Sequence, residues 1–197
     1  MSSILPSTPV IPPFNHSGVL PPFLGADPAG LSAAMSPYRV SVDSFVTTYA
    51  TTPERNAILQ GFMRFRRDLR AIGIAGWQWL DGSFLENIEA LQSRAPQDLD
   101  VVTFFMRPQN ASDPAAWITF VNRNLPVLDR TQTKQRYGCD AQWVDLSTGP
   151  YNVVNHTRYW FGLFSHQRMT GVWKGMLEID HPLLDADAAA RVLLGVS

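Results

Sequence analysis

The stretch WLDGSFLENIEALQSRAPQDLDVVTFF, residues 79–105, decides the fold. It holds a Gly-Ser pair, Gly82-Ser83, and an Asp-x-Asp, Asp98-Leu99-Asp100, each beside an apolar run. Residues i and i+2 of a β-strand point to one face, so Asp98 and Asp100 are expected to project side by side. Two neighbouring carboxylates repel each other unless a cation lies between them, and hard divalent ions prefer oxygen ligands. Without further signals, an Asp-x-Asp is a solvated turn before a strand.

The apolar runs around these motifs predict two core strands, over 74–80 and 98–105. Between them, Gly82 permits a sharp turn and lets a phosphate group approach the backbone closely. Ser83 can either donate its hydroxyl to such a phosphate or cap the helix that follows. Residues 84–91 have helical character, and residues 93–97 are expected to form a loop.

A long helix is predicted before this stretch. It begins after the N-cap Thr52, has Pro53 as its first residue, and runs to about Ala71. Apolar residues at helical spacing form one stripe on it: Ile58, Phe62, Phe65, Leu69 and Ile72. Arginines away from the stripe are expected on a solvated face: Arg64, Arg67 and Arg70. Residues 40–49 either alternate as in a strand or begin a short helix, and the pattern does not decide between them.

More elements are predicted after the Asp-x-Asp strand. A helix capped by Ser112 or Asp113 should end at Pro126. Residues 130–136 have the composition of a polar, basic connection. A third strand over 138–146, a helix over 151–164 and a last strand over 171–179 follow. The chain then forms a short helix over 187–194, capped by Asp185 or Asp187.

This order of elements predicts an α/β (α+β) fold in a single domain over 38–197. Residues 1–37 are rich in Pro, Ser and Gly, so we expect an extended segment rather than regular structure. Phe14, Leu20 and Phe23 are candidate anchors of this segment on the domain. For residues 1–12, an extended wrap and a disordered tail fit equally well.

Composition excludes several classes of protein. The net charge of −1 provides no broad basic field for nucleic acid. The single cysteine, Cys139, cannot form an internal disulfide. The N-terminus lacks the pattern of a signal peptide, and no apolar stretch approaches the roughly 18 residues of a membrane span. We therefore expect a cytoplasmic protein with no membrane contact.

The motifs together resemble a known superfamily. A strand, a Gly-Ser pair and an Asp-x-Asp at the head of the next strand are similar to the DNA polymerase β-type nucleotidyltransferases. Further pieces resemble one bacterial nucleotidyltransferase-like family of unknown function, and the likeness covers most of the chain. The pieces are Gly18-Val-Leu-Pro-Pro22 with the helix after it, DGSF at 81–84, DLDVV at 98–102 and Lys174-Gly175.

The resemblance implies a nucleotidyltransferase-like domain, built as a mixed β-sheet flanked by helices. It also implies that the domain moves a nucleoside monophosphate from an NTP, with ATP expected, to an acceptor. It implies that Gly82 and Ser83 hold the nucleotide phosphates and that Asp98 and Asp100 hold Mg²⁺ or Mn²⁺. Lys174 is a candidate phosphate-binding residue, although a solvent-exposed lysine fits as well. Lys134 and Arg136 are weaker candidates of the same kind. A partner protein or a small molecule is favoured as acceptor over nucleic acid, because 197 residues leave little room for a nucleic-acid-binding domain.

The superfamily also places a third carboxylate on a later strand. Asp140 and Asp145 are five residues apart, so they face opposite ways on a regular strand and only one can join the pair. We favour Asp140, because Cys139 and Ala141 beside it are small and its place near the strand start resembles the family pattern. Asp140 would then help to deprotonate the acceptor.

Two features depart from the superfamily pattern. Acidic residues, Glu86 and Glu89, follow the Gly-Ser pair where many active members carry a basic residue, and they would repel a triphosphate unless they face away. The gap from Ser83 to Asp98 is also long. These departures favour an alternative hypothesis, in which the domain is a catalytically inactive module that senses a nucleotide or binds a partner.

Overall fold

Five β-strands form the centre of the fold in the part of the chain that the structure describes. The computed structural model describes residues 11–27, 34–168 and 170–196. Its strands form one mixed sheet in the order β1-β5-β2-β3-β4. β2 is antiparallel to β3 and β5, while β4 runs parallel to β3 and β1 parallel to β5. The strands are β1 (Tyr38–Arg39), β2 (Gly76–Asp81), β3 (Leu99–Phe105), β4 (Cys139–Asp145) and β5 (Leu177–His181).

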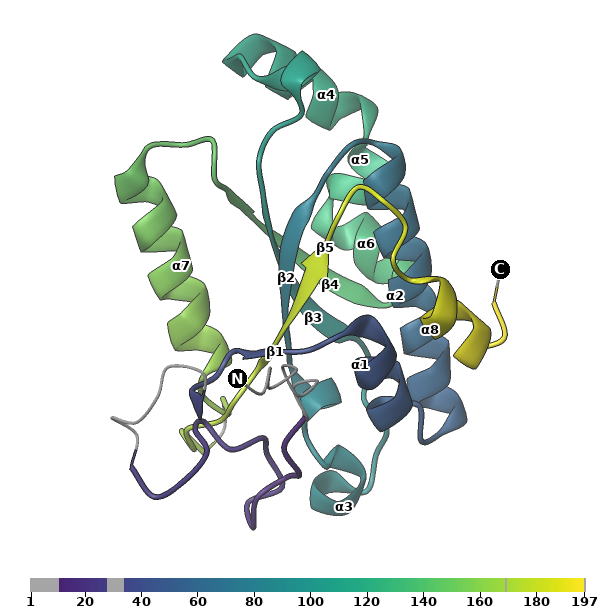
Figure 1. Ribbon diagram of the computed structural model, residues 1–197, viewed down its shortest axis with the longest axis vertical. Helices are drawn as coiled ribbons and strands as arrows, with labels where there is room; N and C mark the ends of the chain where they lie inside the picture. The colour runs from purple at the N-terminus through teal and green to yellow at the C-terminus, as the bar shows by residue number, and fades with distance from the viewer. Residues whose placement is uncertain (1–10, 28–33, 169, 197) are drawn as a thin grey trace, which may run out of the picture.

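Helices cover the two faces of the sheet unequally (Figure 1). The larger core lies on the face covered by α1, α2, α6 and α8, and α7 covers the other face over a smaller aromatic cluster. The helices are α1 (Val42–Tyr49), α2 (Pro53–Ala71), α3 (Ile88–Gln92), α4 (Pro114–Arg123), α5 (Leu125–Leu128), α6 (Arg130–Tyr137), α7 (Pro150–Phe164) and α8 (Ala188–Leu193). In the part of the chain that the structure describes, no helix is long and apolar enough to cross a membrane.

Most of the predicted elements are present, with shifted ends. The α2 helix has its N-cap at Thr52 and ends at Ala71, as predicted. Residues 42–49, which the pattern left open, form a helix capped by Ser41. The predicted strands over 74–80 and 98–105 begin later, at Gly76 and Leu99. The predicted last strand over 171–179 is present only as Leu177–His181. The mixed α/β sheet with flanking helices is confirmed.

Two local predictions were wrong. Residues 130–136 are a helix, α6, because Asp129 caps its N-terminus and Gly138, at φ +66°, ends it. These caps stabilise a polar helix that buries only Thr133 and Tyr137, so its hydrophobic pattern is weak. Pro126 does not close the preceding helix but lies in the first turn of α5, where a missing N–H costs nothing.

The N-terminal segment lies against the domain where it is described. Val19 and Leu20 are fully buried, and Val19 forms an isolated β-bridge with Glu86. Phe14 packs on the main core, and the ring of Phe23 contacts Trp173. The segment therefore packs over the region that follows the Gly-Ser pair. The alternatives for residues 1–10 lie outside the described residues.

A buried ion pair holds the C-terminal segment to α2. The guanidinium of Arg66 is fully buried and donates two hydrogen bonds to the carboxylate of Asp187, at 2.7 and 2.8 Å. Arg70 also donates to Asp187, at 2.8 Å, so its predicted place on the solvated face was wrong. The Asp187 carboxylate therefore binds these arginines, and no side chain caps α8 within the described residues.

We expect Asp187→Asn to lower the free energy of unfolding by about 3–5 kcal/mol, because it leaves the Arg66 charge buried without its partner. Urea denaturation at pH 7 measures this change. Asp180→Asn is the matched control, since the Asp180 side chain is 59% exposed and pairs with the exposed Arg39 on the surface. It should lose less than about 1 kcal/mol. Equal losses in the two variants would contradict a structural role for the buried pair.

Candidate functional site

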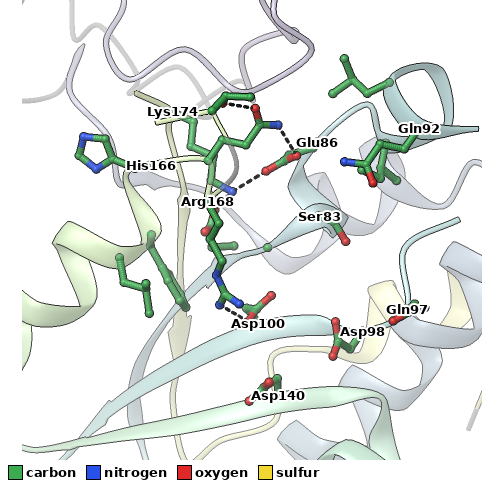
Figure 2. A pocket seen from close by; sticks show the side chains of 18 of the residues that line it. Ser83, Glu86, Gln92, Gln97, Asp98, Asp100, Asp140, His166, Arg168 and Lys174 are labelled. Carbon is green, nitrogen blue, oxygen red and sulfur yellow. Dashed lines mark hydrogen bonds and ion pairs between the residues drawn. The ribbon is translucent and has the colours of Figure 1, made fainter. Parts of the chain in front are cut away.

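Three aspartates lie side by side across neighbouring strands at one end of the sheet. The strand register pairs Asp81 of β2 with Asp100 of β3, and Asp100 with Asp140 of β4. Strand alternation places all three on the face covered by α7, the face to which Trp79 and Val102 contribute their side chains. Asp98 directly precedes β3 and joins the group, as Figure 2 shows.

Gly82 brings the backbone against this row. It has φ +83°, and a Cβ atom there would lie 1.9 Å from the Asp100 Oδ2 atom. Only glycine tolerates both the left-handed backbone and the close carboxylate, so the predicted sharp turn is confirmed. Ser83 begins the 3₁₀ turn η2 (Ser83–Leu85), and α3 begins only after Asn87. No side chain caps η2 or α3 among the described residues, so the alternative role of Ser83 as a helix cap was wrong.

A cavity of about 510 Å³ opens over the aspartates and the Gly-Ser turn. The strand ends form its floor, and α3 forms one wall. The other wall is formed by the end of α7 with residues 166–168, 170 and 174 (Figure 2). Its lining includes all the main site residues that the sequence predicts: Gly82, Ser83, Asp98, Asp100, Asp140 and Lys174. Asp145 lies at the opposite end of β4, where it accepts a 2.6 Å hydrogen bond from Arg107. The geometry thus groups Asp140 with the Asp-x-Asp.

Burial and like charges raise the proton affinity of Asp100. Burial is the largest cause, and the neighbouring carboxylates of Asp98 and Asp140 add to it, so that the pKa of Asp100 is raised to about 6. The pKa of Asp140 is shifted in the opposite direction. Arg130 donates two hydrogen bonds to its carboxylate, at 2.5 and 2.8 Å, and these hold its pKa below the ordinary value. Asp100 is therefore the better proton acceptor of the two.

Lysine and arginine side chains from distant segments balance the charge of the aspartates. The Lys134 ammonium lies 2.5 Å from Asp98 and 3.6 Å from Asp140. Arg168 reaches down from the segment after α7 and places its guanidinium 3.9 Å from Asp100 (Figure 2). Sequence reasoning missed Arg168 and Arg130, since neither lies near the Gly-Ser or Asp-x-Asp motifs in the chain.

Lys174 is neither exposed nor free. Its side chain is buried, and its ammonium lies 2.8 Å from Glu86 and 3.1 Å from Asp81. Burial raises the pKa of Asp81 to about 7, although the charge of Lys174 acts against this shift. Two carboxylates therefore neutralise the one ammonium, and Lys174 connects the end of β2 to the segment that precedes β5.

Both acidic residues after the Gly-Ser pair have partners. Glu86 is buried and accepts hydrogen bonds from Lys174 and Gln167, each at 2.8 Å. Glu89 is absent from the cavity lining and accepts hydrogen bonds from the buried Arg55, at 2.6 and 2.9 Å. These partners largely offset the repulsion that Glu86 and Glu89 were expected to exert on a phosphate. The cavity lining also contains basic residues, namely Arg94, Lys134 and Arg168.

Some site residues differ from the sequence prediction. Arg136, a weaker candidate, packs its guanidinium on the ring of Tyr137 and does not line the cavity. Asp81 was missed, although a signal was present. It follows Trp77 and Trp79 at steps of two along the strand, and strand alternation places it on their face.

The side chains in the aspartate row have the chemistry that a hard divalent cation requires of its ligands. Asp98, Asp100 and Asp140 supply carboxylate oxygens, the ligands that Mg²⁺ and Mn²⁺ take in proteins. Their crowded negative charge, which adds to burial in raising the pKa of Asp100, would be relieved by a cation. Within residues 11–27, 34–168 and 170–196, no three acidic, His or Cys side chains converge closely enough to hold a metal ion as they stand. Arg130, Lys134 and Arg168 balance the charge in this arrangement.

Comparison with known proteins assigns the chain to a family. Residues 12–180 match a family described as a family of unknown function (DUF6932), and the chain belongs to it. No curated protein and no solved structure matches the chain.

The contact between Gly82 and Asp100 can be tested by Gly82→Ala. The new methyl group should force the Asp100 carboxylate out of its buried place, so the pKa of Asp100 should fall from about 6 towards its ordinary value. Titration of the side-chain carboxyl by NMR measures it. Gly25→Ala is the control, because Gly25 has φ +93° but no atom within 4 Å of its Cβ position. An unchanged Asp100 pKa in Gly82→Ala would contradict the contact.

The stability of the protein should depend on the charge of Asp100. Because its pKa is higher in the folded than in the unfolded chain, the contribution of Asp100 to stability should fall as the pH rises from about 4 through about 6. Asp100→Asn removes this charge. It should be more stable than the wild type at pH 8 by on the order of 2 kcal/mol, with no gain near pH 4. Asp145→Asn, which removes the partner of Arg107, should show no gain at pH 8. Urea denaturation at the two pH values measures both.

Proposed function

We propose that this member of a family of unknown function is a metal-dependent nucleotidyltransferase with a nucleotidyltransferase-like fold. It would move a nucleoside monophosphate from an NTP, with ATP expected, to the hydroxyl group of an acceptor. The observation that carries the proposal is the contact of the Gly82-Ser83 turn with Asp100 in the aspartate row, at the base of a cavity of about 510 Å³. That volume lies within the range of small-molecule sites.

The residues of the cavity divide into two groups with distinct proposed roles. Asp98, Asp100 and Asp140 would hold Mg²⁺ or Mn²⁺, and the bound metal supplies charge neutralisation of the pyrophosphate leaving group and activation of the attacking hydroxyl. The Gly82-Ser83 turn would bind phosphate oxygens through its backbone and the Ser83 hydroxyl. Lys134 and Arg168 would interact with the phosphates, since both already lie within 4 Å of the carboxylates.

Asp100 and Asp140 would both act as metal ligands. A bound cation would favour the charged form of Asp100, whose carboxylate is buried beside Asp98 and Asp140. Asp140 is held in its charged form by Arg130, and its expected help in deprotonating the acceptor stays a prediction. Lys174 would position the turn rather than bind phosphate, because its ammonium is already held by Asp81 and Glu86.

One observation favours a second candidate function, a catalytically inactive module that senses a nucleotide or binds a partner. Each of the three carboxylates already has a cationic side chain within 4 Å. A site that has lost its metal would need such compensation. This candidate predicts nucleotide binding without turnover, or no nucleotide binding at all.

Calorimetric titration tests the proposal. A non-hydrolysable ATP analogue with Mg²⁺ should bind the wild type, and Asp100→Ala should reduce the affinity at least tenfold because it removes a ligand at the centre of the row. Asp145→Ala is the matched control on β4, since its side chain lies at the far end of the strand with Arg107. It should bind as the wild type does.

The outcomes separate the two candidates. Binding that requires Mg²⁺ and Asp100 supports the transferase and justifies a search for its acceptor among proteins and small molecules. Binding that is indifferent to Mg²⁺ favours the sensing module. The absence of binding for ATP, GTP, CTP and UTP analogues, in a protein that circular dichroism shows to be folded, would overturn the transferase proposal.

A further inference from the structure

A second cavity, of about 360 Å³, adjoins the first at Asp100 and Asp140. The two cavities also share Leu163, Phe164 and Arg168, but the second extends along β4 and α7, away from the Gly-Ser turn and α3, and is lined there by Arg130, Gln142, Tyr159 and Trp160. The two cavities therefore meet at the same carboxylates. A transfer reaction needs this arrangement, because donor and acceptor must approach one reacting centre from different directions.

The wall of the second cavity that α7 contributes is aromatic. The rings of Tyr159 and Trp160 lie 4.9 Å apart at 80°, and Trp160 meets Phe164 at 5.8 Å. Tyr159 is 59% exposed although it belongs to a helix that covers the sheet, so its ring is accessible to a ligand. Aromatic faces of this kind bind planar rings by stacking. Gln142, which points to the same face of β4 as Asp140, adds an amide that can both donate and accept hydrogen bonds.

Two guanidinium groups make the second cavity suitable for an anion once the carboxylates hold a cation. Arg130 uses two of its five N–H donors on Asp140, and its side chain is 62% exposed. Arg168 lies 3.9 Å from Asp100, beyond hydrogen-bond distance. A divalent ion bound to the carboxylates would neutralise their negative charge. The positive charges of both arginines would then be free to bind an anion. Arginine is well suited to binding phosphate, because its planar fork can donate two parallel hydrogen bonds.

We propose that the second cavity is the acceptor site, and that the acceptor is a small anionic molecule with a planar ring and a hydroxyl group, the chemistry of a nucleotide. This inference rests on the proposed transferase function, because it needs a donor NTP in the first cavity. The ring stacks on Tyr159 and meets Trp160 edge to face, the phosphate binds Arg130 and Arg168, and the hydroxyl points to Asp100.

The transfer step balances without a further reactant. The acceptor's hydroxyl oxygen forms a bond to the α-phosphorus of the NTP, and the bond from that phosphorus to pyrophosphate breaks. The hydroxyl proton is released to solvent water. The products are a dinucleotide and pyrophosphate.

Calorimetry on the full chain tests the acceptor site. AMP, GMP, CMP and UMP are titrated in turn into protein saturated with Mg²⁺ and the non-hydrolysable ATP analogue. At least one should bind with a stoichiometry near one, and Tyr159→Leu should weaken this binding about tenfold, the loss of one stacking contact. Tyr151→Leu is the matched control, because Tyr151 lies 80% exposed in the first turn of the same helix and does not line the cavity. It should bind the monophosphate as the wild type does.

The result for the analogue itself separates this inference from the proposed function. If the analogue does not bind the wild type, the transferase proposal fails. If the analogue binds but none of the four monophosphates does, or if both tyrosine variants behave alike, only the acceptor site is overturned. Mass spectrometry after incubation with Mg²⁺, ATP and the monophosphate that binds best should then detect the dinucleotide. Its absence, with the monophosphate bound, would overturn the nucleotide as acceptor.

Discussion

Crowding of negative charge at one end of the sheet is the constraint that organises the surrounding structure. Strand register places Asp81, Asp100 and Asp140 in one row, and Asp98 lies beside them. Carboxylates this close cannot all remain charged without cations nearby. The fold supplies these cations from distant segments. Lys134 and Arg130 lie on α6, while Arg168 and Lys174 lie in the segment between α7 and β5.

The same constraint explains the positions of elements whose own sequence signals are weak. α6 is polar and buries few residues, yet it projects Lys134 and Arg130 at the aspartates. Residues 171–176 precede β5 outside regular structure, and they bury Lys174 between two carboxylates. Breaking one partner of a buried ion pair is costly, so these contacts fix the cavity walls against the sheet.

The unequal covering of the sheet creates the space for the site. The face with α1, α2, α6 and α8 is filled by the main core, whereas α7 is the one helix of the described residues that covers the opposite face (Figure 1). Among the residues of α7, only Phe164 is buried. The region between α7 and the aspartate row is therefore open, and both cavities lie there. An open, charged region beside a packed core is typical of a binding site rather than of a structural surface.

The sequence by itself determined the features that depend on local rules. Alternation predicted that Asp98 and Asp100 share a face, capping predicted the start of α2, and the glycine at 82 predicted a sharp turn. Only the tertiary structure decided which groups meet. It placed Asp140 rather than Asp145 in the row, neutralised Glu86 and Glu89, and brought Arg168 over Asp100. The physical reason is that the charge on these residues is balanced through space by partners from other elements, and such pairings leave no periodic pattern along the chain.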